Sequence, residues 1–220
     1  MGPEYHQMNG SSDLLEHGYV HLPDFLPPHV TRNFLRQLWK DLREQNVPIR
    51  APDKSVLKKH ALEIHSRDYM PMATFHWGMT AAISKVVGSD LLPSYAYFRL
   101  YAGGDVCLVH SDRPASEYSI SLTLAYSDDK PWGLSIGTLP VADSRSRDDD
   151  FGDEPHKTIM MREGGALLYQ GSLRRHGRVE PNPNKWSAHL FLQWVSKDGL
   201  HREYAFEGIA PPGEESISFG

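Results

Sequence analysis

The sequence has little cysteine and no long apolar run, and each shortage excludes a class of protein. Cys107 is the single cysteine among 220 residues, so the chain can form neither an internal disulfide nor a thiolate zinc cluster. No stretch reaches the roughly 18 apolar residues of a membrane-spanning helix, and residues 1–12 lack the apolar core of a signal peptide. We therefore expect a protein of the reducing cytoplasm that does not enter membranes.

Positive charge is also scarce. Lysine and arginine number 23 against 28 acidic residues, which gives a formal net charge of -5. The basic residues are scattered, so the sequence offers no stripe that follows a phosphate backbone. We expect no nucleic-acid partner, and no feature of the sequence indicates an oligomeric state.

The length suits one hydrophobic core with a flanking layer better than two catalytic domains. We expect an unstructured N-terminus over residues 1–12, a single domain over 13–208 and a loose tail over 209–220. Residues 18–25 alternate like a short strand, and apolar residues recur at helical spacing over 29–45 and 72–87. Residues 46–70 are charged, contain two prolines and indicate an irregular segment or lid. Residues 13–90 would thus form helical support and a lid.

From residue 91 onward the chain favours β structure. Strands are expected at residues 95–101, 106–110, 118–126, 132–138, 157–162, 166–169 and 188–195, and the polar stretch 143–154 is expected to be an exposed loop. Ser119, Ser121 and Thr123 alternate with apolar residues, and Glu117 shares their parity, so this polar face should line a pocket. The succession of short strands predicts a mainly β sandwich or barrel over residues 91–208.

Three residues form a candidate metal site. His110 and Asp112 stand two apart at the end of an apolar strand, where their side chains point to one face. About one His-x-Asp is expected by chance in this composition, but His176 follows a glycine-framed apolar strand and supplies a third ligand. Two imidazoles and one carboxylate leave positions open, as in non-haem Fe(II) sites that bind a co-substrate and O2. The alternative is a pair of salt-bridged core histidines.

Three segments resemble the Fe(II)- and 2-oxoglutarate-dependent dioxygenases, particularly the prolyl 4-hydroxylase-like enzymes, over most of residues 18–197. GYVHLPDFLPP is similar to their N-terminal approach, YFRLYAGGDVCLVHSD to their His-x-Asp segment, and YQGSLRRHGRV with NKWSAHLFLQW to their distal-histidine segment. The resemblance implies a double-stranded β-helix, or jelly roll, with N-terminal helices packed on one sheet. It also implies Fe(II) held by His110, Asp112 and His176, and oxidation of a C–H bond coupled to conversion of 2-oxoglutarate and O2 to succinate and CO2.

The buried distal carboxylate of 2-oxoglutarate needs a paired cation. Lys185 with Ser187 is the first candidate, although the family's basic residue lies about one position farther from the distal histidine. Arg178 is the rival, because it shares the inward parity of His176 and carries a bidentate guanidinium. Further candidate contacts for the co-substrate are Arg99, Tyr101 and Thr123. The residues expected nearest to the substrate are Tyr97, Arg113, Glu117 and Trp132.

The substrate is expected to be small and polar, such as an amino acid or a natural-product intermediate, and to be hydroxylated or desaturated. Asp112 disfavours halogenation, because the related halogenases replace this carboxylate with a small residue. A peptidyl, prolyl-type hydroxylase is the alternative within the class. Outside the class stand a non-catalytic jelly-roll binding module and a cupin-like iron protein that does not use 2-oxoglutarate.

Overall fold

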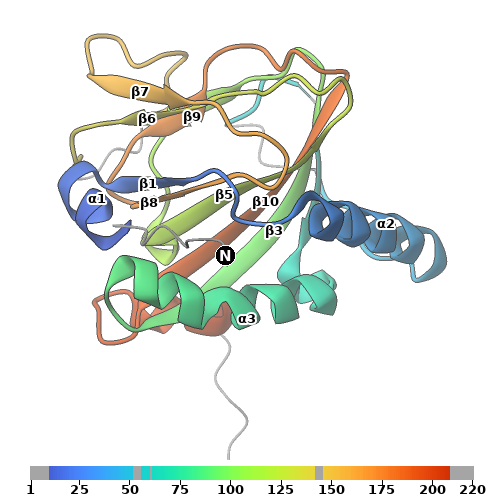
Figure 1. Cartoon of the computed structure of the whole chain (residues 1–220), viewed down its shortest axis with the longest axis horizontal. Coiled ribbons are helices and arrows are strands. Elements are labelled where there is room, and N and C mark those ends of the chain that lie inside the picture. Colours follow the sequence, from blue (N-terminus) through green and yellow to red (C-terminus); the bar gives the residue numbers. More distant parts are fainter. Residues whose placement is uncertain (1–9, 52–55, 60, 142–145, 209–220) are drawn as a thin grey trace, which may run out of the picture.

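The computed structural model describes residues 10–51, 56–59, 61–141 and 146–208. Within these ranges two antiparallel sheets face each other, and helices cover the outer side of the larger sheet (Figure 1). The helices are α1 (Gly10–His17), α2 (Pro28–Glu44) and α3 (Met70–Val87). The strands are β1 (Tyr19–Leu22), β2 (Ala61–His65), β3 (Leu91–Ala102), β4 (Cys107–His110), β5 (Tyr118–Tyr126), β6 (Leu134–Gly137), β7 (His156–Ile159), β8 (Ala166–Tyr169), β9 (His176–Arg178) and β10 (Trp186–Ser196).

The strand order confirms the expected jelly roll. The six-stranded sheet runs β1-β8-β5-β10-β3-β2 and the four-stranded sheet runs β4-β9-β6-β7. From β3 onward the chain therefore crosses repeatedly between the two sheets, which is the winding of a double-stranded β-helix. In the larger sheet β10 lies between β5 and β3, and its register sets His189 opposite both Thr123 and Arg99.

The two faces of the larger sheet carry different chemistry. On β5, Ile120 and Leu122 belong to the apolar core that also contains Leu35 and Leu38 of α2. Burying each such side chain is worth roughly 1.5–3 kcal/mol, which fixes the helices to this face. The residues between them point the other way, and Ser121 accepts a hydrogen bond from Arg178 of the smaller sheet. The expected polar face of this strand thus lies between the sheets.

The two long helices occur where the sequence pattern predicts them. α2 has a proline in its first turn, where no backbone N–H is required. α3 ends at Gly88, whose φ of +82° is a left-handed conformation that glycine adopts without strain. No helix in the described ranges has both the length and the apolar character to cross a membrane.

The segment 46–70 corrects one expectation. It contains β2, which pairs with β3 at the edge of the larger sheet, and a 3-10 turn, Ser66–Asp68. The sequence of β2 does not show the apolar–polar alternation of a strand, because its inward-pointing residue Glu63 is charged. In the structure this carboxylate is buried against Arg99. Residues 52–55 and 60 lie outside the described part, as do residues 1–9 and 209–220 of the expected N-terminus and tail.

Two further boundaries differ from expectation. Residues 10–12 belong to α1, so the unstructured terminus predicted through residue 12 is wrong at its end. In the stretch 143–154, Phe151 is only 4% exposed and stacks on His156. Arg175 binds both Asp148 and Glu154, so an apolar anchor and paired charges hold the described part of this polar stretch.

Candidate metal centre

The three predicted ligands meet between β4 and β9. These strands pair antiparallel with His110 directly opposite His176, and Asp112 follows two residues after the end of β4. The Nε2 atom of His110 lies 3.7 Å from one Asp112 oxygen, and the Nε2 atom of His176 lies 3.7 Å from the other. The three ligand atoms all lie within 4.8 Å of one another, close enough to converge on one ion.

Backbone carbonyls fix both imidazoles in the tautomer that a metal requires. Nδ1 of His110 donates to the Leu108 carbonyl at 2.7 Å, and Nδ1 of His176 donates to the Arg174 carbonyl at 2.9 Å. Each ring therefore presents an Nε2 lone pair to the centre, the arrangement that outer hydrogen bonds impose on metal-binding histidines. Burial lowers the pKa of His110 and of His176 to about 4, with His176 also acting on His110. Both rings are neutral at pH 7, so the salt-bridged pair is disfavoured.

The Asp112 carboxylate is buried beside the two imidazoles, and no arginine or lysine among the described residues lies within ion-pair distance of it. Burial raises its pKa, although His110 and a hydrogen bond from Ser119 at 3.1 Å act in the opposite direction. Gly171 makes the close approach possible, because a Cβ there would lie 2.6 Å from the Asp112 carboxylate and 2.3 Å from the Ser119 hydroxyl. A buried carboxylate beside two neutral imidazoles fits a divalent metal ion.

Arg178 brings an unpaired charge into the space between the sheets. It is 1% exposed, donates to the Trp132 carbonyl and the Ser121 hydroxyl, and lies 4.8 Å above the Trp132 ring. Its remaining contact is Nδ1 of His189 at 3.3 Å. All these partners are neutral, and no carboxylate among the described residues forms an ion pair with it. A buried guanidinium without a counter-ion fits an anionic ligand.

His189 adds a second unsatisfied group beside Arg178. The ring is fully buried, and its Nε2 atom has no hydrogen-bond partner in the structure. Burial, followed by the charge of Arg178, lowers the pKa of His189 well below its usual range. Thr123 lies 3.5 Å from Nδ1 of this ring, so the neutral imidazole, the hydroxyl and the guanidinium form one polar lining.

The other residues expected at the co-substrate have different surroundings. Arg99 is buried but bound to Glu63, and it also donates to the Tyr101 hydroxyl at 3.0 Å. The Lys185 side chain is exposed, and its backbone N–H donates to Asp128. Ser187 is buried and accepts a hydrogen bond from Asn182 at 3.1 Å. The structure therefore brings Arg178 and Thr123 together in the interior, and leaves Lys185 outside.

The four residues expected near the substrate also differ in their surroundings. Tyr97 stacks on Phe191 with ring centroids 4.7 Å apart, and Trp132 is buried beneath Arg178. The Arg113 guanidinium lies 4.3 Å above the Tyr95 ring, next to the metal ligand Asp112. Glu117 points elsewhere, because its carboxylate accepts hydrogen bonds from the backbone and hydroxyl of Ser196.

Sequence reasoning did not single out Gly171, His189 or Gln193 as site residues. Gln193 accepts a hydrogen bond from Ser119, which links it to Asp112. Both His189 and Gln193 share the parity of Ser187 on β10, and that alternation was a signal for their inward direction. Nothing in the sequence marked Gly171 beyond its place in a glycine-framed strand.

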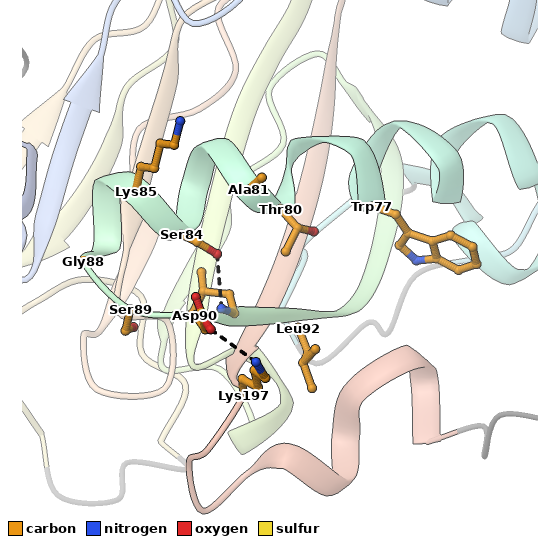
Figure 2. Close-up of a pocket in the computed structure, with 11 residues that line it drawn as sticks. Trp77, Thr80, Ala81, Ser84, Lys85, Gly88, Ser89, Asp90, Leu92 and Lys197 are labelled. Atoms are coloured by element: carbon orange, nitrogen blue, oxygen red, sulfur yellow. Dashed lines mark hydrogen bonds and ion pairs between the residues drawn. The ribbon is translucent and has the colours of Figure 1, made fainter.

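A separate, shallow hollow of about 720 Å³ lies at the C-terminal end of α3 (Figure 2). Lys197 and Asp90 pair across it at 3.2 Å, and Ser84 accepts a hydrogen bond from the Leu91 backbone. Lys85 points away from the other lining residues in Figure 2. The hollow is lined by α3 and by residues at the adjoining ends of β3 and β10, and none of the three candidate metal ligands lines it.

Comparison with known proteins identifies the fold. No protein-family model and no curated protein sequence matches the chain. Among solved structures, the non-heme alpha ketoglutarate dependent carbocyclase SnoK from nogalamycin biosynthesis aligns with a TM-score of 0.66 at 14% identity, over 97% of this chain and 98% of that chain.

Two further structures agree. HygX from Streptomyces hygroscopicus, solved with nickel, 2-oxoglutarate and hygromycin B, aligns with a TM-score of 0.64 at 12% identity, over 87% of this chain and 88% of its own. A prolyl-4-hydroxylase from Pseudomonas putida aligns with a TM-score of 0.55 at 15% identity, over 84% of this chain and 98% of its own. The chain therefore has the fold of the 2-oxoglutarate-dependent oxygenases.

Proposed function

We propose that this protein is an Fe(II)- and 2-oxoglutarate-dependent oxygenase that hydroxylates or desaturates a C–H bond of a small polar molecule. The observation that carries the proposal is the convergence of two neutral imidazoles and one carboxylate within 4.8 Å. This donor set is that of non-haem Fe(II) oxygenases, which need open positions for further ligands. The fold shared with SnoK and HygX supports the same class, and a hygromycin-bound neighbour supports a small-molecule substrate.

The metal-binding roles follow from the hydrogen bonds. His110 and His176 bind the ion through Nε2, because their Nδ1 atoms already donate to carbonyls. Asp112 supplies the third ligand, and Ser119 orients it. When bound, Fe(II) and 2-oxoglutarate supply the oxidising chemistry with O2, and succinate and CO2 are released.

Arg178 is the proposed anchor of 2-oxoglutarate, in place of Lys185. Its guanidinium is buried among neutral groups, so a dianionic ligand would remove the cost of an unpaired charge. Thr123 and His189 lie beside it and would hydrogen-bond the same carboxylate or its water. Lys185 is exposed, and a carboxylate held there would gain little over water.

The free, buried Cys107 supports a reducing, cytoplasmic location for such an enzyme. Its thiol has no oxidising partner, and burial raises its pKa, so it is not the nucleophile of a different chemistry.

The test is an anaerobic titration of Fe(II) and 2-oxoglutarate into wild type and His176→Ala. Wild type should develop the weak visible charge-transfer absorption of the chelate, and His176→Ala should not, because one ligand is lost. Thr31→Ala on α2 serves as a control for a buried change away from the candidate site, and unfolding curves of all three establish that they are folded. A folded wild type without the absorption band would reject the oxygenase and favour a binding module or an iron protein independent of 2-oxoglutarate.

A further inference from the structure

A cavity of about 260 Å³ opens beside the metal centre at the edge of the larger sheet. Its lining includes His65, Arg67, Ser94, Tyr95, Arg113 and Glu207. The cavity lies where β2, which pairs only with residues 97–101 of β3, leaves the earlier part of β3 without a strand on that side, while β10 pairs with its other side. Arg113 directly follows Asp112 in the sequence and its charge acts on that carboxylate, so this wall of the cavity lies near the metal centre.

The lining is basic. Arg113 lies over the Tyr95 ring, and neither Arg113 nor Arg67 forms an ion pair with a described carboxylate. Glu207 is the acidic residue of the lining, and one of its oxygens already accepts a hydrogen bond from Ser66 at 2.7 Å. Two guanidinium groups and one partly engaged carboxylate line the cavity, while Asp112 and Asp68 act on the two arginines from outside the lining, so the lining itself favours an anionic ligand.

Ser94 is a buried polar residue shared by this cavity and a neighbouring hollow. It is 3% exposed, and its hydroxyl has no hydrogen-bond partner in the structure. A buried hydroxyl without a partner is unfavourable, so this wall of the cavity has unused hydrogen-bonding capacity.

Aromatic rings lead from the cavity toward the interior. Tyr95 stacks on Tyr97 with centroids 6.2 Å apart, and Tyr97 stacks on Phe191 at 4.7 Å. Phe191 stands two residues from Gln193 on β10, and Gln193 is linked through Ser119 to Asp112. A row of stacked aromatic rings therefore leads from the arginine-lined cavity toward the strand that carries Gln193, and a planar ligand body packs favourably against such rings.

We infer that this cavity is the substrate site and that it selects a small organic acid, whose carboxylate is held by Arg113 and Arg67 and whose body lies along Tyr95 and Tyr97 toward the metal. This inference rests on the proposed function, because the cavity is a substrate site only if the protein is an oxygenase. Arg113 supplies bidentate recognition of the carboxylate. The volume lies just below the range of about 300–1,000 Å³ typical of drug-sized ligands, so it suits a molecule of amino-acid size.

The test uses 4-fluorobenzoate and its neutral isostere 4-fluorobenzamide as probes, observed by fluorine NMR. Both are titrated into the full chain, with and without Ni(II) and 2-oxoglutarate, whose own binding is measured separately. Arg113→Gln, Arg67→Gln and Arg36→Gln are compared with wild type. Arg36 is the matched control, because it is an exposed arginine of α2 that contacts Asn33.

The acid should bind saturably, and the amide about tenfold more weakly or worse, since only the acid forms charge-assisted hydrogen bonds. Arg113→Gln should weaken acid binding about tenfold, Arg67→Gln by less, and Arg36→Gln not at all. The inference is overturned if the acid does not bind by about 20 mM, if acid and amide bind alike, or if Arg113→Gln binds as wild type does. If Ni(II) and 2-oxoglutarate do not bind, the proposed function is rejected. This outcome is distinct from failure of the inference, because binding of the acid is also measured on the metal-free chain.

Discussion

Two buried arginines, one on each sheet, have opposite surroundings. Arg99 of β3 lies against Glu63 of the neighbouring β2, and its guanidinium is also close to the Tyr97, Tyr101 and Phe191 rings. Arg178 of β9 has only neutral partners among the described residues. Arg99 thus has a counter-ion within the protein, and Arg178 has none among the described residues.

The difference separates a charge that is paired within the protein from one that, under the proposed function, pairs with 2-oxoglutarate. Burial alone would raise the pKa of Glu63, but the hydrogen bond from His65 and the charge of Arg99 leave it lowered, so the pair is ionised at neutral pH. A charge buried without a counter-ion is costly, and a protein retains it where a ligand supplies the partner. Predictions from this comparison concern stability on the Arg99 side and ligand affinity on the Arg178 side.

The largest effect is expected from Glu63→Gln. The change leaves the Arg99 guanidinium buried without a carboxylate, and breaking such a pair costs about 3–5 kcal/mol. Urea unfolding at pH 7 measures this loss. In the folded variant, the affinity for 2-oxoglutarate should stay close to that of wild type.

A double variant separates charge from packing. Glu63→Met with Arg99→Met removes both charges, and it should recover most of the stability that Glu63→Gln loses. Equal destabilisation by the single and double changes would mean that packing at β2, and not the ion pair, holds this edge of the sheet.

Arg178→Gln should show the reverse pattern. Loss of one partner of a buried charge pair costs about 2–5 kcal/mol of binding, so the affinity for 2-oxoglutarate should fall about 100-fold, measured by anaerobic titration with Fe(II). The ligand-free protein should unfold at the same or a higher urea concentration, since the change removes an unpaired charge. A variant that keeps its affinity would make Arg178 a structural residue like Arg99.

A smaller effect concerns pH. The folded-state pKa of His189 lies well below its usual value, so the unfolded chain takes up a proton below about pH 6.5 that the folded chain does not. Stability from this group is therefore present above that pH and is lost as the pH falls. In Arg178→Gln one cause of the lowered pKa is removed, and burial, the larger cause, remains.

Urea unfolding of wild type and Arg178→Gln at pH 7 and pH 5 measures this coupling. The variant should lose less stability between the two pH values, while the other histidines contribute equally to both proteins. An equal loss would show that burial alone keeps His189 neutral down to pH 5 in the folded protein.

Strand parity explains why the convergence of His110, Asp112 and His176 was predictable and the charge partners of the buried arginines were not. The period of two fixes the directions of His110 and Asp112 once the strand is recognised, and Arg178 follows from His176 in the same way. Strand parity predicts the face to which a side chain points, but not how deeply it is buried or which charged residue lies beside it. The counter-ion of Arg99 comes from β2, whose charged residues resembled a loop, and pairing across strands far apart in sequence depends on the fold.

The exposure of Lys185 also could not be predicted from the sequence. Its distance in sequence from His176 resembles that of the family's basic residue, but the turn before β10 sets whether a side chain enters the interior or leaves it. Here the backbone N–H of Lys185 is bound to Asp128 in that turn, and the side chain is exposed.

The smallest effect should therefore come from Lys185→Gln. The substitution keeps the backbone hydrogen bond to Asp128 and removes only an exposed charge, worth at most about 1 kcal/mol. Its affinity for 2-oxoglutarate, titrated beside Arg178→Gln, should stay within about twofold of wild type. A tenfold loss in Lys185→Gln with no loss in Arg178→Gln would reverse the assignment, because the exposed lysine would have to turn inward on binding and the buried arginine would be structural.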